Sequence, residues 1–210
     1  MNPYQEIARD ADVLAALRAA TASRHERLDH GLPLAGAAPG LAEYASHLRL
    51  VRDWLAPLQA WLAGYGDGPQ AVLAPVARLS LIEADLLEAG MPAACAPLAA
   101  QVWPEGASAA YRWGVCYVIE GSQLGGAVLY GRLAERLAPH PLRYLRGEPG
   151  GPGPRWRTVM QALRGEVRTP AEIAEACAGA CAAFDSILAL SPDTRKMFTS
   201  PVDSRPPHSS

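Results

Sequence analysis

The sequence predicts an all-α fold, organised as one helical domain of six to eight helices. Alternating polar and apolar residues are hard to find and β-branched residues are sparse, whereas alanine and leucine recur at helical spacing. The chain has 210 residues, of which 50% are hydrophobic, and this is enough for one domain with a buried core. Together these observations favour a bundle of packed helices.

Two helices are expected in the first third of the chain. Residues 11–30 form the first, with Asp10 or Asp12 as its N-cap. Residues 40–63 form the second, because their apolar positions keep a spacing of three and four. Pro57 lies inside this second helix and is expected to bend it.

A third helix is expected over residues 70–89, where Gly90 and Pro92 end it. A shorter helix over residues 93–101 is also compatible with the pattern. Residues 103–106, Trp-Pro-Glu-Gly, then form a turn before the longest apolar segment of the chain.

That segment, residues 111–137, is predicted to be one long helix with glycines in its interior. Gly121, Gly125 and Gly126 lie in mid-helix, where each costs roughly 1 kcal/mol relative to alanine. Gly114, Gly121 and Gly125 are spaced by seven and four residues, which places them on one helix face. A face without side chains admits either a second helix, as in Gly-x-x-x-Gly packing, or a planar ligand. The spacing alone leaves both interpretations open.

The last third of the chain is predicted to begin with a long loop, because residues 138–154 are dense in proline and glycine. Helices follow over residues 155–165 and 170–189, and Thr169-Pro170 starts the second of them. The domain therefore covers residues 11–190, between a flexible N-terminus (1–10) and a disordered tail (191–210).

Composition and charge argue against several classes of partner. The net charge is −2, so no basic excess indicates a nucleic acid or an anionic membrane. No signal-peptide pattern and no run of about eighteen uncharged apolar residues occurs, which favours a cytoplasmic protein. The four cysteines lie in apolar helical contexts and give no disulfide or zinc pattern: Cys95, Cys116, Cys177 and Cys181.

The first helix carries the most suggestive pair of polar residues. Arg18 and His25 are seven residues apart, on one face, so that an imidazole and a cation could meet the iron and a carboxylate of one haem. His30 competes as the ligand, but it lies about 140° around the helix from His25. His47, beside Arg49 on the second helix, is expected to be solvated.

Two motifs, about a hundred residues apart, resemble those of the haem oxygenases, and most closely of the bacterial branch. Leu17 to His25 resembles the proximal-helix signature: leucine, a basic residue, two small residues, threonine, three variable positions and histidine. The stretch Tyr117 to Gly126 resembles the distal helix of the same family. Weaker similarity runs through 44–58, 79–86 and 156–163, so the resemblance covers most of residues 13–190.

The resemblance implies a role for each motif residue. His25 would be the proximal ligand of the haem iron, and three glycines would let the distal helix lie over the haem face: Gly121, Gly125 and Gly126. Ser122 stands where animal members have an aspartate that anchors distal water, and bacterial relatives also tend to have serine there.

The same resemblance implies contacts to the haem propionates. Arg18 stands at the position of a basic propionate contact, and Tyr117 where some bacterial members have a propionate-binding tyrosine. Arg157 corresponds to a further basic contact, in a region where the alignment is loose. Such contacts would fix the rotation of the ring and so decide which meso carbon faces the oxygen, with the α-meso carbon as the default.

The family's activity is the oxidative cleavage of haem to biliverdin, carbon monoxide and iron. Haem would be both substrate and cofactor, and O2 would be the oxidant. Electrons would come from a ferredoxin or a reductase, because the chain has no flavin or nicotinamide fingerprint of its own. A bacteriophytochrome that receives biliverdin is a further partner that the resemblance implies.

Two other functions remain open from the sequence. The distal serine, with no strong acid near it, is also compatible with a haem carrier that has no turnover. A helical scaffold in which the glycine face packs another helix is the second. Enzymes of thiamine metabolism share the fold, but their cysteine and carboxylate pattern is not visible here.

Overall fold

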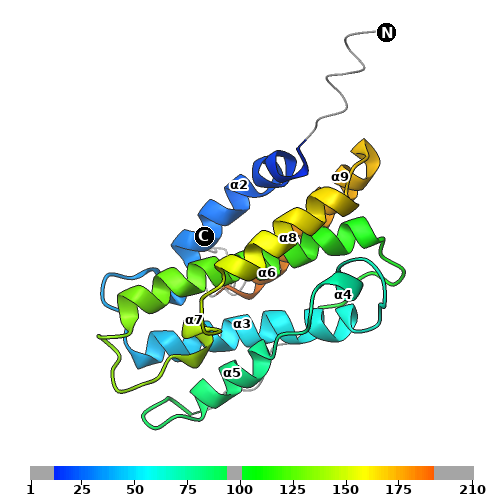
Figure 1. The fold of residues 1–210 in the computed structure, drawn as a ribbon. Coiled ribbons are helices and arrows are strands. Elements are labelled where there is room, and N and C mark those ends of the chain that lie inside the picture. Colours follow the sequence, from blue (N-terminus) through cyan, green and yellow to red (C-terminus); the bar gives the residue numbers. More distant parts are fainter. Residues whose placement is uncertain (1–11, 94–100, 192–210) are drawn as a thin grey trace, which may run out of the picture.

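The computed structural model describes residues 12–93 and 101–191. Within these residues the chain forms eight α-helices, one short 3-10 helix and no β-strand (Figure 1). In chain order they are α2 (Val13–Gly31), η1 (Pro33–Ala35), α3 (Leu41–Leu62), α4 (Pro69–Val72), α5 (Arg78–Leu86), α6 (Ala109–Leu133), α7 (Arg143–Arg146), α8 (Gly153–Glu166) and α9 (Pro170–Leu190). The predicted all-α fold is confirmed. Several predictions lie outside the described residues: most of the 93–101 helix, Asp10, Cys95, the N-terminus (1–10) and all of the predicted tail except Ser191.

Helix α9 is the centre of the bundle, because it packs against α6, α2 and α3. Helix α8 lies along α6, and the short helices α5 and α7 lie together at one end of the molecule (Figure 1). Helices α6 and α9 cross very closely. A Cβ on Gly114 would overlap the carbonyl oxygen of Ala176, and one on Gly179 would overlap the carbonyl oxygen of Tyr111.

The helix starts follow the predicted capping chemistry. The Asp12 carboxylate accepts a hydrogen bond from the backbone N–H of Leu14 at 3.1 Å, and it therefore satisfies one of the free amides at the start of α2. Thr169 and Glu172 form a capping box at the start of α9. Helix α3 continues through Pro57 from Leu41 to Leu62.

Two predicted elements were wrong in detail. The helix expected over 70–89 is two helices, α4 and α5, because Pro75 lacks an amide donor and disfavours helical geometry at the residue before it. The loop expected over 138–154 contains α7 and the start of α8. The buried Asp85 carboxylate accepts the backbone N–H of Arg143 at 3.0 Å and of Tyr144 at 2.9 Å, which stabilises the turn of α7 from another helix.

Asp85 also fastens this turn to α3. Its side chain is fully buried and accepts the Tyr44 hydroxyl at 2.6 Å. Burial, followed by this hydrogen bond, raises the pKa of Tyr44, so the phenol stays a donor. The network fixes the backbone of Tyr144, whose side chain lines the cavity described below.

One helix of the described residues, α9, is long and apolar enough to cross a membrane by length and composition. Half (50%) of its most apolar stretch is buried inside the protein, and its neighbours are α6, α2 and α3. Its apolar character is therefore accounted for by its central place in the bundle.

Candidate active site

A cavity of about 430 Å³ opens between α2, α3, α6 and α9. Its lining is mainly apolar with a few polar side chains, as is usual for sites that bind organic cofactors. Most of the predicted site residues meet in it: His25, Tyr117, Gly121, Ser122, Gly125 and Gly126.

The glycines of α6 fall into two groups with different physical roles. Gly114 is required by the close crossing with α9. A Cβ on Gly121 would approach the Trp156 ring only to an ordinary 3.5 Å, and one on Gly125 would meet nothing within 4 Å. Protein packing therefore does not explain glycine at these two positions, although both line the cavity. A flat ligand that contacts the helix backbone would explain them.

His25 faces the same cavity from α2, with 65% of its side chain exposed. Its Nδ1 lies 2.9 Å from Oδ2 of Asp29, one helical turn further on. Because a carboxylate at Nδ1 fixes the tautomer and orientation of the ring, Nε2 is the atom available to a metal. Phe184 packs beside the imidazole, with ring centroids 5.8 Å apart.

The donor set fits haem iron better than a bare ion. Among residues 12–93 and 101–191, no three His, Cys, Asp or Glu side chains gather into a cluster that could hold a metal ion. One imidazole facing a broad apolar cavity suits an iron whose other ligands come from a porphyrin. His30, the alternative ligand, points elsewhere: it is exposed, outside the lining, with Nδ1 2.7 Å from the carbonyl oxygen of Glu26.

The residues predicted to bind propionates are only partly brought together. Tyr117 lines the cavity, with its ring centroid 5.5 Å from that of Trp156. Burial raises the pKa of Tyr117, and the nearby positive charge of Arg18 opposes this rise. Arg18 itself is exposed and outside the lining. Arg157 is exposed on α8 and also outside the lining, which its neighbour Trp156 joins instead.

Ser122 belongs to a short polar chain at the cavity wall. Its Oγ donates to the carbonyl oxygen of Ile119 at 2.7 Å and accepts from Nε2 of Gln123 at 3.1 Å. The same Gln123 amide group lies 3.2 Å from the Tyr144 hydroxyl, which it reaches as a donor. Burial raises the pKa of Tyr144, so its hydroxyl stays protonated. Gln123 itself is outside the lining, and Tyr144, which is in the lining, was not expected in the site.

His47 contradicts its predicted solvation. It is only 5% exposed and it lines the cavity. Desolvation lowers its pKa to about 4. The sequence contained the signal, because His47 follows Tyr44 by three residues and precedes Val51 by four, which places it on the apolar face of α3.

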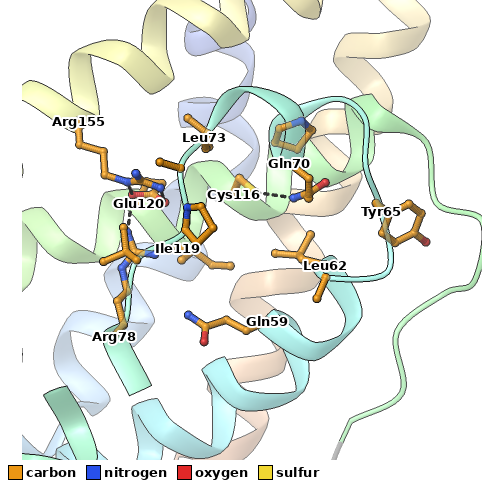
Figure 2. A pocket seen from close by; sticks show the side chains of 15 residues that line it. Gln59, Leu62, Tyr65, Gln70, Leu73, Arg78, Cys116, Ile119, Glu120 and Arg155 are labelled. Carbon is orange, nitrogen blue, oxygen red and sulfur yellow. Dashed lines mark hydrogen bonds and ion pairs between the residues drawn. The ribbon is translucent and has the colours of Figure 1, made fainter. Parts of the chain in front are cut away.

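A second cavity, of about 360 Å³, lies against a different set of α6 side chains (Figure 2). Its lining contains no histidine and none of the α6 glycines. Its polar wall is an ion cluster in which Glu120 binds Nη2 of Arg78 at 2.6 Å and Nε of Arg155 at 2.7 Å. Glu120 directly precedes Gly121, so these bonds to α5 and α8 fix the rotation of α6 about its axis.

Comparison with known proteins identifies the family of the chain. No family model matches the chain. It is 36% identical over 144 residues to the heme oxygenase of Xanthomonas campestris pv. campestris (strain 8004), an alignment that spans 66% of this chain and 79% of that protein. The fold is similar to that of the heme oxygenase from Neisseria meningitidis in its NO- and CO-bound crystal structures, with a TM-score of 0.63, 24% identity, and coverage of 95% and 98% of the two chains. By its similarity to the Xanthomonas protein, the chain belongs to the haem oxygenase family.

Proposed function

We propose that this protein opens the porphyrin ring of haem, releasing biliverdin, carbon monoxide and free iron, with O2 as oxidant and electrons from an external donor. The observation that carries the proposal is the cavity in which His25 faces Gly121 and Gly125, two glycines that protein packing does not require. Bound haem would supply the iron that activates O2 as well as the carbon that is attacked.

His25 would hold the substrate by its iron. The Asp29 carboxylate at Nδ1 makes the imidazole a better donor at Nε2 and prevents its rotation away from the cavity. Phe184 packs against the ring and restricts it further. The His25 imidazole would hold the iron, and the iron would supply the binding site for a small ligand.

The opposite wall of the cavity would control which small molecules reach the iron. With haem bound, the bare backbone at Gly121 and Gly125 would leave space for O2 but not for bulky groups. Ser122 and Tyr144 would hold water along this wall, since Gln123 already joins them in one hydrogen-bonded chain. Water held in this way can deliver protons and hydrogen bonds without a charged acid at position 122.

The propionates would set the rotation of the ring. Tyr117 in the lining and Arg18 close to it are the proposed contacts, because a phenol and a guanidinium can both donate to carboxylates. Arg157, outside the lining, stays a prediction from the resemblance. Opening at the α-meso carbon is the default that the resemblance implies.

Electrons would come from a ferredoxin or a reductase in the cytoplasm, since the chain carries no nucleotide fingerprint of its own. A bacteriophytochrome is a proposed receiver of the biliverdin. Co-purification of a bilin with such a photoreceptor expressed alongside this chain would support that part of the proposal.

The decisive test compares His25→Ala with His30→Ala after reconstitution with haem. Wild type and His30→Ala should show the spectrum of a histidine-ligated haem and, with a reductant and air, lose the Soret band as biliverdin absorption grows. His25→Ala should lose both. Unchanged turnover in His25→Ala, or a wild-type oxy complex that persists without forming a bilin, would contradict the proposal.

A further inference from the structure

His47 is a polar side chain in the cavity that neither motif of the sequence included. It lies on α3, is 5% exposed, and its Nδ1 is buried with no hydrogen-bond partner. Buried polar atoms are normally paired, so an imidazole whose Nδ1 has no partner is an exception, and here it lies in the wall of a ligand cavity. Phenylalanine would fill a similar volume without burying an unpaired polar atom, so packing alone does not explain an imidazole at this position.

The other titratable side chains that line the cavity come from three elements: His25 and Asp29 from α2, Tyr117 from α6, and Tyr144 from α7. The lining side chains of α8 and α9, such as Trp156 and Phe184, carry no titratable group. Desolvation is the one cause that lowers the pKa of His47, so no neighbouring charge perturbs it. The imidazole is therefore neutral at neutral pH, with one donor and one acceptor nitrogen.

The two nitrogens have different surroundings. Nδ1 is sealed inside the protein, and a sealed acceptor without a partner is less unfavourable than a sealed donor. This favours the tautomer with the proton on Nε2. Because the ring lines the cavity, Nε2–H is then a neutral donor available to a molecule inside it.

We propose that His47 is a positioning residue for the haem ligand: through Nε2–H it holds a water molecule in the cavity, and this water donates a hydrogen bond to the ligand on the iron. The inference rests on the proposed function, because it needs haem in this cavity. It adds a neutral donor from α3 to the wall formed by α6. The Ser122 hydroxyl already donates its proton to the carbonyl oxygen of Ile119, so His47 would supply a donor that the serine cannot.

The first measurement uses the protein without haem. Long-range 1H–15N spectra of the full chain, assigned by comparison with His47→Gln, report the tautomer of each histidine. His47 should be the neutral Nε2–H tautomer at pH 7 and remain so below pH 6. An Nδ1–H tautomer, or a charged ring at pH 6, would overturn the proposal before any haem is added.

The second measurement uses the ferric haem complex with azide as probe. The side-chain amide of Gln can place a donor near the Nε2 position, whereas that of Asn mimics Nδ1. We expect His47→Phe and His47→Asn to weaken azide binding about 10-fold, which corresponds to about 1.4 kcal/mol, and His47→Gln to restore most of it. The midpoint at which iron-bound water loses a proton should rise in the same two variants. His30→Gln, an exposed change, is the matched control.

The outcomes separate the two proposals. A wild-type protein that binds no haem, or binds it without His25, refutes the proposed function. A wild type with histidine-ligated haem, but with equal azide affinity in His47→Phe, His47→Asn and His47→Gln, refutes the role of His47 alone. Should Phe be too large for the site, the Gln and Asn pair still decides, because the two differ only in where they place the amide.

Discussion

At the residue scale, the pairing of His25 with Asp29 determines how firmly an iron would be held. Both side chains are more than half exposed, at 65% and 59%, so their bond contributes little to stability. In the complex the same bond would be covered by the porphyrin, and its effect would pass to the iron through the imidazole.

We therefore expect Asp29→Asn to weaken the iron–histidine bond. The uncharged amide is a poorer acceptor for Nδ1–H, so Nε2 becomes less electron-rich and haem affinity should fall about 10-fold. Resonance Raman spectroscopy of the ferrous complex should show a lower iron–histidine stretching frequency. Glu26→Gln, an exposed change on the same helix, should leave the frequency unchanged; an equal frequency in Asp29→Asn would contradict the role of the carboxylate.

The sequence predicted some residues of the candidate site and missed others for physical reasons. His25, Ser122 and the glycines belong to local motifs, and they meet in one cavity as expected. Asp29 and His47 were recognisable from helical spacing, since each lies at an i+4 or i+3 position from a residue already singled out. Tyr144 was not recognisable, because its place depends on the bond from Asp85 in another helix.

At the element scale, α6 uses glycine for two purposes along one face. Its N-terminal half meets α9 so closely that Gly114 has no room for a side chain, and its middle is bare toward the cavity. The sequence left helix packing and ligand approach as alternatives, and the structure shows helix packing at Gly114 but an open cavity at Gly121 and Gly125. The elements that the sequence misjudged, α4, α5 and α7, depend on one proline and on tertiary hydrogen bonds.

Gly114→Ala should destabilise the fold. The added methyl would overlap the carbonyl oxygen of Ala176, and moving two central helices apart costs about 3 kcal/mol in the free energy of unfolding. Urea denaturation followed by circular dichroism measures this loss. A midpoint equal to that of the wild type would show that α6 and α9 cross less closely than described.

Gly125→Ala should have the opposite effect on stability and a harmful effect on function. Nothing in the protein lies within 4 Å of the added methyl, and alanine favours the helix by up to about 1 kcal/mol. The haem-free protein should therefore unfold at higher urea, while haem affinity or bilin formation falls because the methyl occupies the ligand's space. Gly131→Ala, exposed in the last turn of α6, should leave haem binding and bilin formation unchanged. Haem binding as tight as that of the wild type, with unchanged bilin formation, would remove the main argument for the proposed function.

At the scale of the whole molecule, the two walls of the cavity are aligned through a shared neighbour. Helices α2 and α6 both pack against α9, and the buried bonds of Glu120 and Asp85 prevent α6 and α7 from turning. The packing of the bundle itself therefore shapes the cavity, and it buries polar groups such as His47. That burial should be visible in the acid stability of the whole protein.

The direction in which stability changes with pH follows from the pKa values of His47 in the folded and unfolded states. The pKa of His47 is about 4 in the folded state, whereas a histidine in the unfolded chain has a pKa of about 6.5. Between these values the unfolded state binds more protons than the folded state, so stability falls as the pH falls from about 6.5 to 4 and levels off below. Above pH 7 His47 is neutral in both states and has no effect on the pH dependence.

Urea denaturation of haem-free wild type and His47→Gln at pH 7 and pH 4.5 tests this coupling. Carboxylates also titrate in this range, but they contribute equally to both proteins and cancel in the comparison. The wild type should lose about 2 kcal/mol more than the variant between the two pH values. Equal losses would mean that His47 takes up a proton as easily in the folded protein as in the unfolded chain, which would contradict the desolvation implied by its 5% exposure.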